Sequence, residues 1–435
     1  MPLDITVEVE EQIHTYQAAD NGAGPLWCHG STIVARRGDD VYLAALETLP
    51  DQVPLNNCRF VLYHRTDGDW ILIYRDETGR TREPSPIVLL NSEVLVSANP
   101  TLANPGEYAG PAEPTAFRFD TTNPNAAPVR ERLVWRDDPA FSEHSYRTVV
   151  GDGSEVLYLQ NVGYDKAHIS FRDTIGRWQG LAPLIWPRGD EYDPPQPLRL
   201  CYPNVALHQR SAHFLGVGDI VEPVAAWKEA KHQITGRDWD YVFRRLFYAY
   251  TPDLLAEPFG AWIEIANRDS SAGHIRNGDL HLADDGTVHL LWTETNIDHR
   301  LRDRFFPGQQ ITHTLEHLTL KEGQIQTRHT LVRTIEGEAG PIPHLARFHV
   351  LEDNTLVIIG QFTGIGPSPI YRCALAGEDQ PEWIDIPFSQ PMPGTFLTNT
   401  IRGGSSPSSL VDIVGMSPTS PNTLGYAQIK IEKRE

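Results

Sequence analysis

The chain has 435 residues, with 57 Asp or Glu against 37 Lys or Arg, so its formal net charge is −20. This balance argues against a general nucleic-acid-binding protein and against docking on anionic lipid, since both need a basic surface. It still allows an acidic substrate, because a local group of Arg and His side chains can lie within an acidic surface. No apolar run reaches the ~18 residues that span a bilayer.

The first ten residues contain no basic region followed by an apolar stretch, as an export signal would. We therefore expect either a cytoplasmic protein or a secreted or periplasmic one whose leader was removed. The four cysteines are too few for a disulfide scaffold and are expected to be buried thiols. A bridge between Cys28 and Cys58 is the alternative for an exported protein.

Short β-type runs joined by tight turns follow one another along the chain. In each hairpin, two apolar runs flank a turn in which Gly or Asn lies beside Asp, a composition typical of tight β-turns. The clearest hairpins span 31–46, 59–75, 146–160, 279–293 and 346–361.

One helix interrupts this pattern. Val224, Trp227 and Ala230 recur at helical spacing after Pro223, which predicts a helix over Glu222–Gln233. We expect a small helical insertion near 222–238 that lies over one face of the fold.

The hairpins restart about every 45 to 70 residues, near positions 31, 92, 145, 203, 275, 345 and 398. Seven such starts predict an all-β protein: a β-propeller of about seven four-stranded blades, forming a single domain over residues 1–435. A strand at Thr6–Glu10 would close the ring beside Leu424–Ile431. A pair of β-sandwiches is the alternative.

One turn carries a family resemblance. The stretch Ser170–Trp178 resembles a degenerate Asp-box, the structural turn of sialidase-type propellers. Around it, His144–Arg147, Val156–Tyr158 and Ala167–Ile169 resemble the BNR-type repeats of propeller polysaccharide lyases, the ulvan lyases and related rhamnose–glucuronate lyases. Sialidases are disfavoured, since they carry several good Asp-boxes.

The resemblance implies a catalytic group. In those lyases, two His residues from successive strands of one blade line the funnel, with Tyr and Arg from the next blades. His144, His168 and Tyr202 match this pattern, and the Arg, which no motif identifies, is assigned to Arg245. His144 and His168 are 24 residues apart, which suits the first and third strands of one blade.

Polar residues also precede most of the expected inner strands, where they would surround a funnel. The substrate-binding candidates are His29, Asn204, His274 and Asn277. His344 and Asn399 occupy the same position in later blades.

These residue types predict a polysaccharide lyase that cleaves a uronic-acid-containing polysaccharide by β-elimination. An acidic polysaccharide or oligosaccharide is the expected partner, without nucleic acid or membrane. No cofactor is required, although a structural metal ion is an alternative, with Cys201, His208 and His213 as a weak zinc set.

Two other functions stay open. One is a glycoside hydrolase on the same fold, with carboxylates drawn from Glu222, Glu264 and Glu294. The other is a non-catalytic propeller that binds glycans or proteins.

Overall fold

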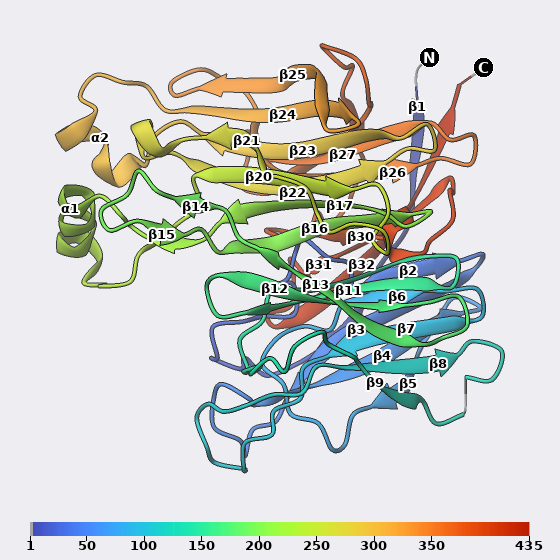
Figure 1. Cartoon of the computed structure of the whole chain (residues 1–435). Helices are drawn as coiled ribbons and strands as arrows, with labels where there is room; N and C mark the ends of the chain where they lie inside the picture. The colour runs from blue at the N-terminus through green and yellow to red at the C-terminus, as the bar shows by residue number, and fades with distance from the viewer. Residues whose placement is uncertain (1–2, 125, 435) are drawn as a thin grey trace.

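The computed structural model describes residues 3–124 and 126–434. Within this part of the chain, seven four-stranded antiparallel sheets form the blades of a β-propeller (Figure 1). The predicted fold is therefore confirmed. The alternative pair of sandwiches is excluded, because each sheet is a separate blade of four strands.

The first four blades follow chain order. Blade 1 comprises β2 (Val34–Arg37), β3 (Asp40–Thr48), β4 (Cys58–Thr66) and β5 (Asp69–Arg75). Blade 2 comprises β6 (Ile87–Leu89), β7 (Glu93–Ala98), β8 (Thr115–Asp120) and β9 (Val129–Arg132). Blade 3 comprises β10 (Arg147–Asp152), β11 (Glu155–Val162), β12 (Lys166–Arg172) and β13 (Trp178–Ile185). Blade 4 comprises β16 (Leu200–His208), β17 (Ser211–Gly218), β20 (Arg245–Thr251) and β21 (Ile263–Asn267).

The remaining three blades complete the ring. Blade 5 comprises β22 (His274–Leu282), β23 (Thr287–Thr295), β24 (Thr312–Lys321) and β25 (Gln324–Ile335). Blade 6 comprises β26 (Ile342–Val350), β27 (Leu356–Thr363), β28 (Ile370–Leu375) and β29 (Ile384–Ile386). Blade 7 comprises β30 (Leu397–Thr398), β31 (Leu410–Met416), β32 (Thr423–Lys433) and the N-terminal strand β1 (Leu3–Thr15).

The two ends of the chain close the ring as the sequence predicts. Strand β1 is the outermost strand of blade 7 and pairs antiparallel with β32, with Thr6 opposite Lys430. The inner strand of this blade differs from expectation. It is the short β30, and a 3-10 turn (Ile401–Gly403) replaces the strand expected from Ile401. Asn399 consequently follows its inner strand instead of preceding it.

Insertions gather at one end of the propeller, which we call the upper face. It is the end at which the inner strands begin (left in Figure 1). The predicted helix is present as α1 (Ala225–Thr235), between the short paired strands β18 (Ile220–Val221) and β19 (Tyr241–Val242). It contacts α2 (His299–Phe305), which joins β23 to β24. The pair β14 (Arg188–Gly189) and β15 (Gln196–Pro197) joins blades 3 and 4.

The core lies between neighbouring blades. Leu157 and Ile169 of blade 3, for example, pack with Val205 and Phe214 of blade 4. Inner strands such as β6 are buried on both faces, because each face packs against a neighbouring blade: Ile87 and Leu89 against blade 1, Val88 against blade 3. No helix of the described chain is long and apolar enough to cross a membrane.

The Asp-box-like stretch is a turn between β12 and β13. Oδ1 of Asp173 accepts hydrogen bonds from the backbone N–H groups of Ile175 (3.1 Å) and Arg177 (2.8 Å). The carboxylate thus stabilises the turn between the two outer strands of blade 3.

Candidate functional site

The propeller channel opens into a cavity at each end. The cavity on the upper face, which we call the upper depression, has a volume of about 330 Å³. Its lining consists mainly of Trp27, His29, Tyr202, Phe243, His274 and Arg276. Most of these residues precede or begin the inner strands of several blades, and Phe243 ends the insertion of blade 4. They therefore lie close together around the propeller axis.

Aromatic rings form one wall of the depression. The Trp27 ring stacks on Tyr146 with centroids 4.7 Å apart and lies 5.7 Å from Tyr202. His29 stacks on Tyr202, with ring centroids 4.2 Å apart. The His144 ring lies 5.5 Å from Trp27 and 5.1 Å from Tyr146. His144 is not itself a lining residue, but it and Tyr202, expected to share a face, lie beside the same two aromatic rings, Trp27 and Tyr146.

The backbone holds Tyr202 in an unusual conformation. Its φ is +51°, a left-handed value that a bulky residue seldom adopts, within a bulge of the β16–β17 pair. Nδ2 of Asn277 donates to the Tyr202 carbonyl at 2.6 Å. Gly30 approaches that carbonyl so closely that a Cβ on residue 30 would lie 1.9 Å from its oxygen. Strain that the surroundings maintain in this way is frequent at functional sites.

His144 is oriented by a buried carboxylate. Its Nδ1 lies 2.9 Å from Oε1 of Glu83, and because a carboxylate only accepts, Nδ1 carries the proton. Glu83 is fully buried and also accepts from the backbone N–H and the hydroxyl of Ser145. The His144 side chain is 28% exposed. In a neutral ring with its proton on Nδ1, Nε2 is the nitrogen that carries the lone pair.

Arg276 contributes a positive charge to the depression. It donates to Nε2 of His344 (3.2 Å) and to the hydroxyl of Thr395 (2.7 Å), and no ion pair links it to a carboxylate of the described residues. Burial lowers the pKa of Arg276 to about 10, so it remains cationic at neutral pH. Arg82 is a second cation nearby, with its guanidinium 3.4 Å from Nδ1 of His144.

The titratable rings of the depression are held neutral. Burial is the main reason that the pKa of Tyr202 is raised far above its ordinary value, and the charge of Asp219 raises it further. Tyr202 is therefore a protonated phenol. The His274 side chain keeps contact with solvent, but the surrounding protein still desolvates it. This desolvation, together with the charge of Arg276, lowers the pKa of His274 to about 4.

Two expected catalytic residues do not reach the depression. His168 is 3% exposed and packs against Trp135 and Phe141, on the side of β12 that faces blade 2. Because side chains alternate along a strand, it points away from blade 4, whereas its neighbour Ala167 packs toward that blade. The expectation that His168 pairs with His144 and converges with Tyr202 on one face is therefore corrected.

Arg245 is the second such residue. It begins the third strand of blade 4, away from the axis, and forms ion pairs with Glu191 and Glu264. Asp269 lies 3.9 Å away. Because three carboxylates surround it, the positive charge of Arg245 is already neutralised by the protein and does not suit a substrate carboxylate.

The four expected substrate-binding residues divide into two groups. His29 and His274 line the depression. Asn277 also lines the depression, at its floor, and Asn204 lies next to it; both are fully buried and bond to each other at 2.6 Å. Asn204 also donates to the carbonyl of Gly30 at 3.0 Å, so these amides cross-link inner strands. Their contribution is to form the floor and to hold Tyr202.

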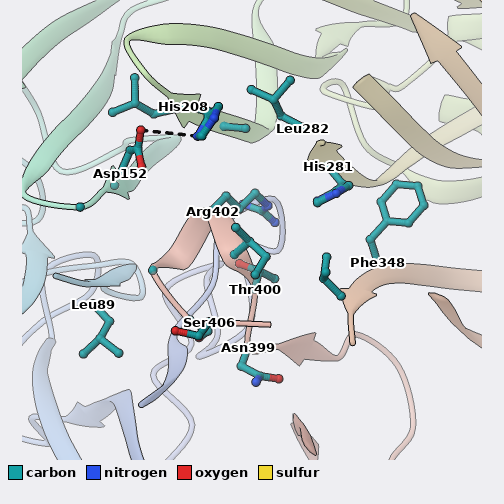
Figure 2. A pocket seen from close by; sticks show the side chains of 18 of the residues that line it. Leu89, Asp152, His208, His281, Leu282, Phe348, Asn399, Thr400, Arg402 and Ser406 are labelled. Atoms are coloured by element: carbon teal, nitrogen blue, oxygen red, sulfur yellow. Dashed lines mark ion pairs between the residues drawn. The ribbon is translucent and has the colours of Figure 1, made fainter. Parts of the chain in front are cut away.

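The other end of the channel opens into a lower cavity of about 320 Å³ (Figure 2). Arg402 lies 3.0 Å from Asp279 and His208 lies 3.6 Å from Asp152, so two of its basic side chains face carboxylates. Arg37 and Asp284 also line this cavity, and neither forms an ion pair among the described residues. Asn399, which we expected on the upper face, lines this cavity.

The carboxylates expected for a hydrolase lie elsewhere, in ion pairs. Glu222 binds Arg244 and Lys231, and Glu294 binds Arg268. None of the residues that line the upper depression is Asp or Glu.

The described residues contain no group of three or more His, Cys, Asp or Glu that could hold a metal ion. The weak zinc set is dispersed: Cys201 donates to the Val217 carbonyl, His213 bonds Tyr248, and His208 pairs with Asp152. All four cysteines are buried and unbridged, Cys28 and Cys58 included.

Sequence reasoning missed Trp27, Glu83 and Arg276. The signal for Arg276 was present, because it lies two residues after His274 on one strand and shares its side of the sheet. Glu83 offered no such signal, since its bond to His144 joins positions 61 residues apart.

No family model and no curated protein matches the chain. Solved structures do. An ulvan lyase of polysaccharide lyase family 25, bound to -[GlcA(1-4)Rha3S]-, aligns over 97% of this chain and 95% of its own, with 7% identity and a TM-score of 0.57. An α-L-arabinanase from Penicillium chrysogenum, with arabinobiose, aligns over 98% of both chains at 11% identity and a TM-score of 0.48. The likeness to the ulvan lyase establishes a shared propeller fold.

Proposed function

We propose that this protein is a polysaccharide lyase that cleaves a uronic-acid-containing polysaccharide by β-elimination in the upper depression. One observation carries the proposal. A cation without a carboxylate partner, Arg276, lies in a depression whose lining contains no carboxylate, beside a protonated Tyr202 and near the Glu83-oriented His144.

Elimination begins with recognition of the uronate. Its carboxylate must be neutralised so that the proton on C5 becomes acidic. Arg276 is suited to this role, because an Arg can donate two parallel hydrogen bonds to a carboxylate. The uronate would offer Arg276 the negative partner that the protein does not supply.

His144 is suited to be the base. With its proton on Nδ1 and directed to Glu83, its Nε2 lone pair can accept the C5 proton. Glu83 then faces an imidazolium, which it stabilises. The positive charge of Arg276 balances the charge that develops on the substrate carboxylate.

Tyr202 is suited to be the acid. The C5–H electron pair forms the C4=C5 double bond, the C4–O bond breaks, and the leaving oxygen takes a proton from the phenol. Its raised pKa keeps the phenol protonated until negative charge develops on the leaving oxygen, which then takes the proton. Exchange with solvent then returns His144 and Tyr202 to their starting states.

A hydrolase is less well supported. Glycoside hydrolysis ordinarily uses a pair of carboxylates about 5 to 10 Å apart across the bond. The lining of the depression contains none, and Glu222, Glu264 and Glu294 are each held by Arg or Lys.

The test is an assay on a panel of acidic polysaccharides, starting with a polymer of the GlcA–Rha3S repeat bound by the structurally similar ulvan lyase. We expect ultraviolet absorbance of an unsaturated uronate to rise with time. New reducing ends without that absorbance would overturn the lyase in favour of a hydrolase. Binding without turnover would indicate a glycan-binding propeller.

A further inference from the structure

Two tyrosines lie side by side on the upper face, outside the depression. Tyr164 is in the turn between β11 and β12, and Tyr241 is in β19 of the blade 4 insertion. Their hydroxyls are 3.3 Å apart, although the residues belong to different blades. Tyr164 is 53% exposed. An exposed aromatic side chain is common, but a pair held together across a blade boundary is not explained by packing alone.

A buried arginine holds these rings from behind. The Arg199 guanidinium lies 4.3 Å from the Tyr164 ring centroid and 5.5 Å from that of Tyr241. It is ion-paired with Asp219 and 4% exposed. The Tyr164 ring therefore has one face supported and fixed in orientation, and its exposure lies on the other face. A ring fixed in advance loses little entropy when a ligand stacks on it.

The same arginine connects the pair to the depression. Arg199 lies 5.3 Å from the Tyr146 ring, which stacks on Trp27 in the wall of the depression. Trp27, Tyr146, Arg199 and Tyr164 thus form a continuous row from the axis to the rim. Trp239, 65% exposed, lies two residues before Tyr241.

We propose that Tyr164 and Tyr241 form a binding subsite for a neutral sugar unit of the polysaccharide, away from the bond that is cleaved. This rests on the proposed function of the depression. The C–H face of a sugar ring would stack on Tyr164, and the two phenol hydroxyls would bond its hydroxyls. The charge of Arg199 is matched by Asp219, so the subsite attracts a neutral unit.

The test compares Tyr164→Ala with Tyr108→Ala, a control at a similarly exposed tyrosine (65%) in the β7–β8 connection. With the polymer of the GlcA–Rha3S repeat, we expect Tyr164→Ala to raise KM about tenfold and change kcat less than twofold. With the shortest oligosaccharide that is cleaved, both variants should match the wild type. An unchanged KM for the polymer, or equal losses on long and short substrates, would overturn the subsite.

Calorimetric binding of the same polymer separates this proposal from the proposed function. If the wild type binds without forming unsaturated uronate, the lyase fails, and a tenfold weaker affinity of Tyr164→Ala still supports the subsite. Equal affinities of wild type and Tyr164→Ala would overturn it. If the wild type does not bind the polymer or the other acidic polysaccharides of the panel, both proposals are overturned.

Discussion

The two ends of the propeller channel hold cavities of nearly equal volume, about 330 and 320 Å³, but their charges are arranged differently. In the lower cavity, Arg402 is matched by Asp279. In the upper depression, Arg276 has only neutral partners, His344 and Thr395. Arg276 is half-buried, and partly desolvating a cation without an anion costs free energy, which the carboxylate of the proposed substrate would offset. Volume alone would not distinguish the two ends.

The largest expected effect contrasts the two arginines. Arg402→Ala leaves Asp279 buried without its cation, so we expect a loss of about 3–5 kcal/mol in the free energy of unfolding. Arg276→Ala removes no ion pair and should change stability by less than about 1 kcal/mol, while lowering kcat/KM on the uronate polymer severely. Denaturant unfolding and the absorbance assay measure both. Equal stability losses in the two variants would remove the distinction between the two ends.

The next effect concerns turnover. His144→Ala and Tyr202→Phe should each lower kcat by at least about 10²-fold, the scale for losing a positioned base or acid, with little change in melting temperature. His208→Ala, in the lower cavity, is the matched control and should keep normal turnover. Near-normal rates in His144→Ala and Tyr202→Phe would refute both roles.

A third prediction tests how Tyr202 is held. Gly30→Ala places a Cβ 1.9 Å from the Tyr202 carbonyl oxygen, so the backbone must move, at a cost of about 1–3 kcal/mol. Turnover should fall as well, because Tyr202 shifts. Gly24→Ala is the control, since a Cβ there meets nothing within 4 Å. The result that contradicts this explanation is an equal melting temperature for the two variants.

The smallest effect is a dependence on pH in blade 5. His281 borders the lower cavity and lies near His289, whose Nδ1 is 3.0 Å from Nε2 of His317. Burial lowers the pKa to about 4 for His281, about 4 for His289 and about 3 for His317. Each pKa is below the unfolded value of about 6.5. The unfolded chain therefore takes up these protons first, and stability is full above pH 6.5 and falls as the pH drops toward 4.

The measurement is the melting temperature between pH 7 and pH 4 for the wild type and His317→Leu. Replacing a titrating ring by an apolar one should flatten the decline, whereas His299→Leu, at an exposed position, should leave it unchanged. Parallel declines in the wild type and His317→Leu would show that this histidine does not contribute.

The structure brings two of the four expected catalytic residues together at the upper end of the channel, and the reason lies in strand geometry. His144 and Tyr202 lie there because a residue just before or at the start of an inner strand is near the channel for any conformation of the preceding loop. His168 and Arg245 were misplaced because third strands lie away from the axis, where alternation decides which blade a side chain faces. A register error of one residue reverses that choice.

The sequence by itself determined the propeller, the closure by the N-terminal strand and the helix in the blade 4 insertion. These depend on local patterns: apolar alternation, turn residues and one helical period. The tertiary structure alone decided which charges remain unpaired. Glu83 meets His144, Glu264 takes Arg245, and Arg276 finds no carboxylate, through contacts between distant parts of the chain. Such pairings follow from how blades pack against one another, and no local pattern in the sequence records them.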